Sequence, residues 1–170
     1  FPYTTLFRSD VGTGAGFPGI PLLIMRPELK ITMIDSTSKK LNFVNAALAE
    51  LGLEADVIQC RAEELAHDSV YREKFDFAVS RAVAPLNVLA EFTLPFVKTG
   101  GALIAMKGAK AQEELNNAGN AIRLLGGRFE KATDIRLTDG AERKLMLIGK
   151  VNPSPVKYPR HGSQISKKPL

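Results

Sequence analysis

The sequence predicts an α/β fold whose mostly parallel sheet ends in an antiparallel hairpin. Three observations support this prediction. A loop with alternating glycines, residues 10–19, precedes a strand-like run that ends in an acid, residues 31–35, as in nucleotide-binding βαβ units. Downstream, stretches with strand periodicity alternate with stretches with helical periodicity. Near the end of the chain, two strand-like runs are joined only by a tight-turn signal, Asp139-Gly140. Together these features predict a Rossmann-like sheet with an antiparallel edge.

The first half of the chain predicts strands and helices in strict alternation. Pro27 ends the first helix. Ser36 or Ser38 caps the second helix, and Gly52 stops it. Apolar side chains recur at helical spacing along that second helix. In chain order, the expected elements are a strand remnant at 10–11, a helix near 19–25, strand 30–35, a helix ending at 51, strand 55–60, a charged helix at 62–74 and strand 75–80.

The second half of the chain completes the sheet. A helix is expected at 83–97, with Pro85 in its first turn and Pro95 breaking it near its end. The turn Thr99-Gly100-Gly101 leads into the next strand. The remaining expected elements are strand 102–107, helix 111–125 and hairpin strands 128–137 and 144–150. An antiparallel hairpin at this position is typical of methyltransferase sheets, whereas nicotinamide-binding sheets close with parallel strands.

Composition limits the classes of function. A chain of 170 residues with 45% apolar residues suits one domain with a sizeable core. No apolar run approaches the roughly 18 residues of a membrane span, and no signal peptide is visible, so we expect a cytoplasmic monomer with no membrane partner. The single cysteine, Cys60, excludes an intrachain disulfide and a cysteine-based metal site, and we expect no metal. The net charge of +5 favours an anionic partner such as RNA.

The two ends of the chain differ from the central domain, residues 10–150. Residues 1–9 resemble a translated sequencing adapter joined to a broken gene. We therefore interpret them as foreign sequence in place of the native N-terminal part. Raw sequencing reads that span the Ser9–Asp10 junction would test this hypothesis. The tail, residues 151–170, has four prolines and four Lys or Arg residues. We expect it to be extended and poorly packed, either merely solvated or following a phosphate backbone.

The glycine loop and Asp35 predict a nucleoside-binding site. Gly12, Gly14 and Gly16 let the backbone turn sharply and let a ligand approach bare N–H groups at a helix N-terminus. Asp35 ends a strand roughly 20 residues further on, where an acidic side chain accepts hydrogen bonds from ribose hydroxyls in dinucleotide folds. The alternative for Asp35 is a cap on the following helix.

The loop Asp10–Pro21 closely resembles the glycine loop of the bacterial ribosomal RNA small-subunit methyltransferase G family, also called glucose-inhibited division protein B. Further matches are Asp35-Ser36 with Lys39-Lys40, Arg61-Ala62-Glu63-Glu64, Ser80-Arg81-Ala82-Val83-Ala84, Met106-Lys107-Gly108 and Lys157-Tyr158-Pro159-Arg160. The resemblance extends over residues 10–170. It implies a class I S-adenosylmethionine-dependent methyltransferase sheet, N-terminally truncated and therefore expected to be impaired as an enzyme. It also implies S-adenosylmethionine as the cofactor, 16S ribosomal RNA of the 30S subunit as the partner, and N7 of one guanine as the methyl acceptor.

The same resemblance implies cofactor contacts at Gly12, Phe17, Ala62, Glu63 and Arg81. Two of these residues have alternative interpretations: Phe17 could be core, and Glu63 could merely favour a helix N-terminus.

Two basic residues are candidates for orienting the substrates. We expect Arg81 to open a helix, where a positive side chain opposes the helix dipole, so an anion such as the cofactor carboxylate or an RNA phosphate would explain it. Lys107 ends a strand and would hold the target nucleotide, unless its stem only covers the edge of the core.

The acceptor atom asks for little acid–base chemistry. Guanine N7 carries an in-plane lone pair and no proton, so alignment with the methyl group, rather than a general base, should dominate catalysis. Both histidines, His67 and His161, are therefore expected to be solvated, and Cys60 to be buried filler without a catalytic partner. The segment Ser80-Arg81-Ala82 lacks the Asn/Asp-Pro-Pro-aromatic motif of enzymes that methylate exocyclic amines.

Two other functions stay open at the level of sequence. The glycines and Asp35 also suit an NAD-dependent oxidoreductase, although the terminal hairpin and the lack of an acid–base pair for hydride transfer oppose it. A truncated chain could instead be a non-catalytic RNA-binding domain.

Overall fold

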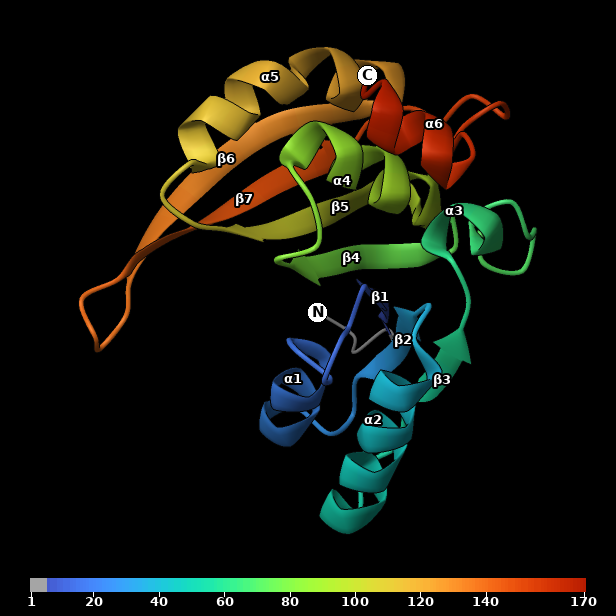
Figure 1. Cartoon of the computed structure of the whole chain (residues 1–170), viewed down its shortest axis with the longest axis vertical. Coiled ribbons are helices and arrows are strands. Elements are labelled where there is room, and N and C mark those ends of the chain that lie inside the picture. Colours follow the sequence, from blue (N-terminus) through green and yellow to red (C-terminus); the bar gives the residue numbers. More distant parts are fainter. Residues whose placement is uncertain (1–5) are drawn as a thin grey trace.

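The computed structural model describes residues 6–170, and its strands within that range form one seven-stranded sheet in the order β3-β2-β1-β4-β5-β7-β6 (Figure 1). The first five strands of the chain pair in parallel, and β7 is antiparallel to both β5 and β6. This confirms the predicted parallel sheet with a terminal hairpin. The strands are β1 Phe7–Val11, β2 Lys30–Asp35, β3 Asp56–Gln59, β4 Phe75–Arg81, β5 Val97–Lys107, β6 Gly127–Arg136 and β7 Glu142–Lys150.

Helices cover both faces of the sheet. They are α1 Gly19–Met25, α2 Ser38–Leu51, α3 Ala62–Leu65, α4 Leu86–Thr93, α5 Ala111–Leu124 and α6 Gly162–Lys167, with a 3-10 turn η1 at Leu94–Phe96. Successive side chains of a strand point to opposite faces. In β2, Ile31 and Met33 accordingly pack with α1 and α2, whereas Ile34 joins the cluster around α3. A third apolar cluster joins α4 and α5 to β4, β5 and β7.

The first strand begins earlier than predicted. β1 starts at Phe7 and pairs with β2 and β4, so Phe7, Arg8 and Ser9 belong to the centre of the sheet. Ser9 and Asp10 are fully buried. This pairing shows how residues 7–9 fold but does not test where residues 1–9 come from, so their foreign origin stays a prediction. Residues 1–5 of that segment lie outside the described part of the chain.

Three local predictions are wrong for identifiable reasons. The helix at 62–74 stops at Leu65, and Asp68 instead caps a turn by accepting a hydrogen bond from the Val70 N–H. The helix at 83–97 begins only at Leu86, because Pro85 disfavours helical backbone at the residue before it. The expected turn at 99–101 lies within β5, whose pairing with β4 shifts register there.

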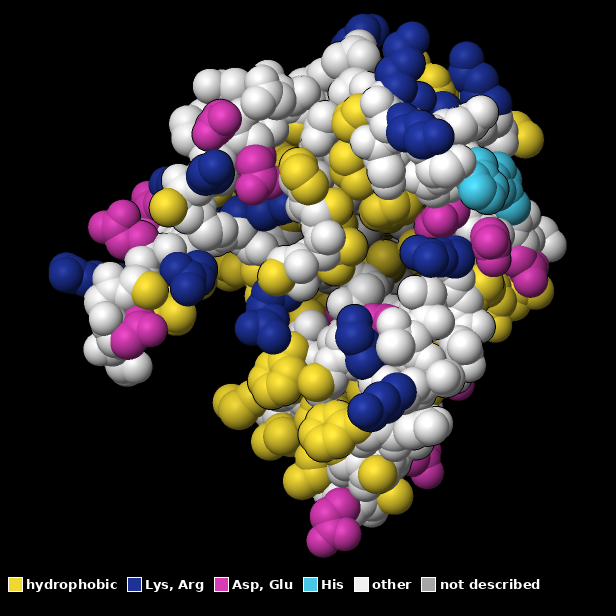
Figure 2. All heavy atoms as spheres, in the orientation of Figure 1, with side chains coloured by type: hydrophobic (Ala, Val, Ile, Leu, Met, Phe, Trp, Pro, Cys, Tyr) yellow, Lys and Arg dark blue, Asp and Glu magenta, His cyan; other side chains and the backbone are white. Residues whose placement is uncertain are grey.

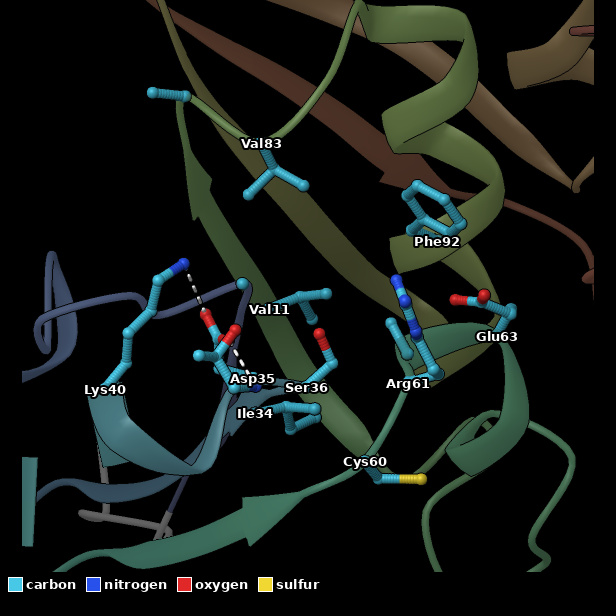
Figure 3. Close-up of a pocket in the computed structure, with 14 residues that line it drawn as sticks. Val11, Ile34, Asp35, Ser36, Lys40, Cys60, Arg61, Glu63, Val83 and Phe92 are labelled. Carbon is cyan, nitrogen blue, oxygen red and sulfur yellow. Dashed lines mark hydrogen bonds and ion pairs between the residues drawn. The ribbon is translucent and has the colours of Figure 1, made fainter. Parts of the chain in front are cut away.

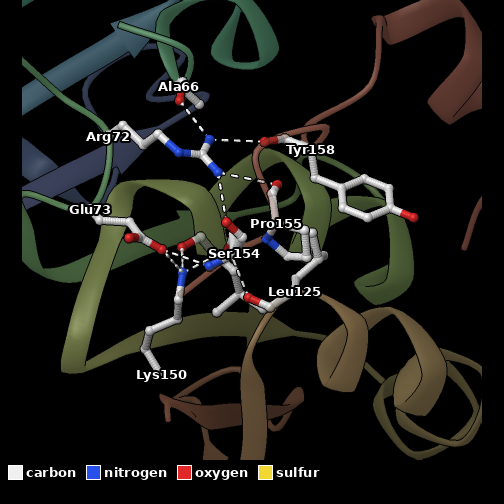
Figure 4. A network of polar contacts seen from close by, with 9 residues as sticks. Ala66, Arg72, Glu73, Leu125, Lys150, Ser154, Pro155 and Tyr158 are labelled. Atoms are coloured by element: carbon white, nitrogen blue, oxygen red, sulfur yellow. Dashed lines mark hydrogen bonds and ion pairs between the residues drawn. The ribbon is translucent and has the colours of Figure 1, made fainter. Parts of the chain in front are cut away.

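The tail also differs from the prediction, because it is packed rather than poorly packed. Tyr158 and Ile165 are buried, and 162–167 form α6. The Arg72 guanidinium donates to the carbonyls of Ala66, Ser154 and Tyr158 (Figure 4). These bonds tie the turn after α3 to the tail.

Two buried ion pairs strengthen this attachment. Lys150 is 1% exposed, lies 3.1 Å from Glu73 and donates to Ser154 Oγ. Burial lowers the pKa of Lys150 to about 8, although Glu73 opposes that shift. Arg160 donates from Nε and Nη2 to the carboxylate of Glu91, which is fully buried in α4. A buried carboxylate requires such a partner.

We predict that Arg160→Ala destabilises the protein by about 3 kcal/mol or more, because it leaves the Glu91 carboxylate buried without its cation. Urea denaturation followed by circular dichroism measures the loss. The matched control is Arg26→Ala, which breaks an ion pair with Glu28 whose side chains are 60% and 56% exposed and should cost less than about 1 kcal/mol. Equal losses of stability in the two variants would contradict the role of the Arg160–Glu91 pair in holding the tail.

Candidate functional site

A cavity of about 280 Å³ opens at the carboxyl ends of β1 to β4 (Figure 3). The chain runs outward from β1 to β2 and β3, and then crosses back to β4 on the other side of β1. Parallel α/β sheets bind ligands at such a reversal of strand order. Its lining residues are Val11, Gly12, Ile34, Asp35, Ser36, Thr37, Lys40, Cys60, Arg61, Ala62, Glu63, Ala82, Val83 and Phe92.

The glycine loop forms one wall of the cavity. The sequence predicts bare N–H groups in this loop, but three of its N–H groups are bonded within the protein. The N–H groups of Gly12 and Thr13 donate to the Ile34 carbonyl, at 2.8 and 3.0 Å, and that of Gly14 donates to Asp35 Oδ2 at 3.0 Å. At Gly12, φ is +72° and a Cβ would lie 2.4 Å from Val83 Cγ2, so a side chain has no room there.

Gly14 and Gly16 shape the same loop without lining the cavity. Both have positive φ, which other residues rarely adopt. A Cβ on Gly16 would meet Ile20 in α1 at 2.4 Å, whereas one on Gly14 would meet nothing closer than 4.0 Å.

Asp35 lies at the edge of the cavity, as its place at the end of β2 predicts. Its Oδ1 accepts from the Thr37 N–H at 2.9 Å, and Lys40 Nζ lies 3.7 Å from Oδ2. Burial opposes ionisation of this carboxyl, but the hydrogen bonds from Thr37 and Gly14 and the charge of Lys40 prevail and lower the pKa of Asp35. The N-cap of α2 is Thr37, which excludes the alternative of Asp35, and the predicted Ser36 or Ser38, as that cap. An ionised acceptor therefore faces the cavity.

Opposite Asp35, the segment after β3 forms a second wall. Ala62 and Glu63 begin α3, line the cavity and are half-buried. Arg61 and Phe92 lie beside Glu63 (Figure 3), although sequence reasoning gave them no role. Arg61 is the first residue of the matched motif Arg61-Ala62-Glu63-Glu64, but Phe92 is one apolar residue on α4 and carries no sequence signal.

Arg81 lies at the edge of the site rather than in the cavity lining. It is the last residue of β4 and does not open a helix, so the helix-dipole argument for it is wrong. Its guanidinium carbon lies 5.1 Å from the centre of the Phe17 ring, a cation–π distance. Phe17 is 45% exposed, which excludes the alternative that it belongs to the core.

Lys107 is placed differently from the prediction of an RNA contact. Its side chain is 6% exposed, and its amino group donates to the Ala84 carbonyl and lies 2.8 Å from Glu114 Oε2. Glu114 also accepts from the Leu86 N–H. Lys107 therefore holds the loop after β4, which carries Val83 into the cavity.

The remaining titratable side chains of interest have structural contacts. His67 and His161 are exposed, as predicted, and His67 Nε2 also lies 2.8 Å from the Pro159 carbonyl. His161 is the N-cap of α6 and accepts from the Ser163 N–H. Cys60 lines the cavity and is only partly buried, and burial raises the pKa of its thiol.

Asp10 accepts hydrogen bonds from both ends of the glycine loop. Its Oδ2 accepts from Thr13 Oγ1 at 2.7 Å and from the Gly19 N–H at 2.9 Å, while its buried Oδ1 has no partner among the described residues. Burial raises the pKa of Asp10 to about 6, and the two hydrogen bonds act in the opposite direction. The loop thus rests on a carboxyl that is costly to ionise.

Comparison with known proteins places these features in a family. The family model described as rRNA small subunit methyltransferase G matches residues 3–146. The ribosomal RNA small subunit methyltransferase G of Lactococcus lactis subsp. lactis is 48% identical over 162 residues, which cover 95% of this chain and 68% of that protein. The protein of the same name from Alkaliphilus metalliredigens is 47% identical over 163 residues, with the same coverage.

Solved structures share the fold. An rRNA methylase from Streptococcus thermophilus superimposes with a TM-score of 0.61 at 19% identity and covers 87% of this chain and 88% of its own. A 16S rRNA (adenine(1408)-N(1))-methyltransferase variant from Catenulisporales acidiphilia gives 0.69 at 15% identity, covering 88% and 87%. The predicted class I methyltransferase sheet is confirmed. Within residues 6–170, every helix is too short or too polar to span a bilayer.

We predict a distinct pH dependence of stability from Asp10. Between about pH 4 and pH 6 the folded protein retains the Asp10 proton that the unfolded chain has lost, so the free energy of unfolding falls as the pH rises through that window. Asp10→Asn removes this contribution. The stability of Asp10→Asn relative to wild type, measured by urea denaturation, should therefore increase from about pH 4 to pH 6. A constant difference would show that Asp10 does not carry the burial penalty.

Proposed function

This chain belongs to the ribosomal RNA small subunit methyltransferase G family, and from that premise we propose that it transfers a methyl group from S-adenosylmethionine to N7 of one guanine in 16S ribosomal RNA, with the 30S subunit as partner. The observation that supports this proposal most strongly is the cavity at the reversal of strand order, which the ionised Asp35 lines together with Gly12, Ala62 and Glu63. The antiparallel β7 argues against the nicotinamide alternative.

The residues around the cavity suit the chemistry of the cofactor. Asp35 is a carboxylate with remaining acceptor capacity for ribose hydroxyls. Gly12 adds no side-chain atoms to the cavity, and a Cβ there would collide with Val83. Ala62 is small enough to let an adenine ring approach its backbone, and Glu63 offers a second acceptor. When bound, S-adenosylmethionine supplies a methyl group on a positively charged sulfur, which is a strong electrophile.

The chain itself would contribute alignment rather than proton transfer. Guanine N7 has a free lone pair and no proton to remove, so the reaction needs no general base. None of the described residues that line the cavity is a histidine. The rigid loop at Ala82 and Val83, held by Lys107, would limit the angle from which the base approaches.

Contacts with RNA would come from cations at the rim. Figure 2 shows Lys and Arg side chains on both sides of the hollow in the middle of this face. Lys39 and Lys40 are exposed at the start of α2, and Arg81 lies exposed over Phe17. Exposed cations of this kind neutralise phosphates without reading sequence. We propose that Arg81 and Phe17 engage either the carboxylate end of the cofactor or the RNA backbone.

The proposal is tested by calorimetric titration and by mapping of methylation. S-Adenosylhomocysteine should bind the chain, and NADH should not. Incubation with 30S subunits or naked 16S RNA and S-adenosylmethionine should then yield 7-methylguanosine at one position, located by borohydride reduction and aniline cleavage. Tight binding of NADH without binding of S-adenosylhomocysteine would overturn the proposal.

For Asp35→Asn, we predict that S-adenosylhomocysteine binds at least tenfold more weakly, because the ribose hydroxyls lose a charged acceptor worth about 1.5–3 kcal/mol. The matched control is Asp56→Asn, which alters an exposed aspartate at the start of β3 outside the cavity. Its affinity should equal that of wild type. Thermal unfolding of both variants separates loss of binding from loss of fold, and retention of affinity in Asp35→Asn would exclude Asp35 as the ribose acceptor.

For Arg81→Ala, we predict an intact fold, since the side chain is exposed at the end of β4, and a fall in methyl transfer of about tenfold, equivalent to 1.4 kcal/mol. Transfer of radioactive methyl groups to 30S subunits measures this effect, with Arg26→Ala as the exposed-arginine control. An unchanged rate in Arg81→Ala would remove Arg81 from the proposed site.

A further inference from the structure

The C-terminal segment reaches the wall of the cavity through Gly162, the first residue of α6. A Cβ at this position would lie 2.1 Å from Glu63 Oε1 and 3.1 Å from Glu63 Cδ. The Glu63 carboxylate therefore lies directly against the Cα of Gly162, where any larger residue would displace it. The two residues are 99 positions apart in the chain, as their numbers show.

The backbone itself does not require glycine at position 162. Gly162 is helical and is not among the glycines with positive φ, so alanine could adopt the same conformation. Glycine is the poorer helix former of the two. What the position requires is the absence of a side chain, because the three heavy atoms nearest to a Cβ there all belong to Glu63.

Contacts on either side of the cavity hold Gly162 in place. Arg160, two residues earlier, is bound to the buried Glu91 of α4 by its backbone N–H and by its guanidinium. The Pro159 carbonyl lies 2.8 Å from His67 Nε2, just after α3. Gly162 is thus fixed relative to α3, which carries Glu63, and relative to α4.

Glu63 stands between two hollows. A second cavity of about 470 Å³ shares Arg61, Glu63 and Phe92 with the first and is otherwise lined by Glu64, His161, Gly162, Ser163 and Ser166. Because the Glu63 side chain is flexible and lines both cavities, the group packed against its carboxylate determines the position of the carboxylate. Gly162 is that neighbour on the side of the second cavity.

We propose that Gly162 is a positioning residue for the cofactor: its Cα backs the Glu63 carboxylate on the side of the second cavity, and the absence of a side chain there leaves this acceptor in place at the wall of the cavity that would receive the adenosine group of S-adenosylmethionine. This inference rests on the function proposed above and adds a residue and a segment to it. Gly162 touches neither the cofactor nor the acceptor base. It acts through Glu63, so docking of the tail and affinity for adenosine are coupled.

The first test is Gly162→Ala. Because the colliding atoms are the far end of a flexible side chain, the fold can survive while the carboxylate moves. We expect the dissociation constant of S-adenosylhomocysteine to rise about tenfold, and KM for S-adenosylmethionine to rise with kcat unchanged. The matched control is Gly119→Ala, because Gly119 is helical in α5 and a Cβ there meets nothing within 4 Å. That variant should bind S-adenosylhomocysteine as wild type does.

A double-mutant cycle identifies the route through Glu63. Glu63→Ala alone should weaken binding of S-adenosylhomocysteine, and Gly162→Ala in that background should cause no further loss, because the collision is gone. If Gly162→Ala alone fails to fold, the double variant should recover the thermal stability of Glu63→Ala, and the affinity of Glu63→Ala itself then tests the role of the carboxylate.

The outcomes separate the two proposals. Wild type that does not bind S-adenosylhomocysteine overturns the proposed function and this inference with it. Wild type that binds, combined with unchanged affinity in Gly162→Ala or with losses that simply add in the double variant, overturns only the role of Gly162.

Discussion

The hydrogen bonds of the short strand β1 hold the two halves of the sheet together, because β1 alone lies between β2 and β4. Its outer end is fixed further by Ser80 Oγ, which donates to the Val11 carbonyl at 2.9 Å. Reversal of the chain on either side of β1 opens the crevice in which Asp35 and Val83 face each other. The site therefore exists because the strand order changes direction at one strand. The residue that follows this strand in the cavity wall is Gly12, where a side chain would collide with Val83.

Buried charge fixes the C-terminal segment to this sheet. Lys150 and Glu73, like Arg160 and Glu91, place one partner of each pair almost entirely out of water. Such pairs contribute little net stability compared with apolar packing, but a mispaired partner is very costly. The tail is consequently restricted to one docked position. Hydrophobic contacts of Tyr158 and Ile165 alone would allow more latitude, so the ion pairs explain how a proline-rich segment becomes an ordered wall.

Local patterns made the sheet, the hairpin and half of the site predictable from sequence. Gly52 adopts the left-handed conformation that ends α2, as its position predicts, and Asp35 follows β2 at the spacing of a ribose acceptor. Properties that depend on distant partners were not predictable. Lys107 looks like a free cation until Glu114 and Ala84 surround it. The tail has the composition of an unstructured segment, but Arg72 and Glu91 bind it. The sequence suggests that Arg81 opens a helix, but Pro85 delays the start of α4 to Leu86.

A common principle connects the cavity walls with the proposed chemistry. Methylation of a nitrogen that carries no proton leaves alignment as the main task of the protein, and alignment is only as good as the rigidity of the groups that provide it. Three parts of the wall are contacted by groups outside the cavity: Asp35 by the N–H of Gly14, the Val83 loop by Lys107, and Glu63 by the Cα side of Gly162. These contacts come from the glycine loop, β5 and the C-terminal segment, so segments far apart in the sequence together shape the cavity. A substitution far from the reacting atoms can therefore impair methyl transfer without altering any residue that touches the substrates.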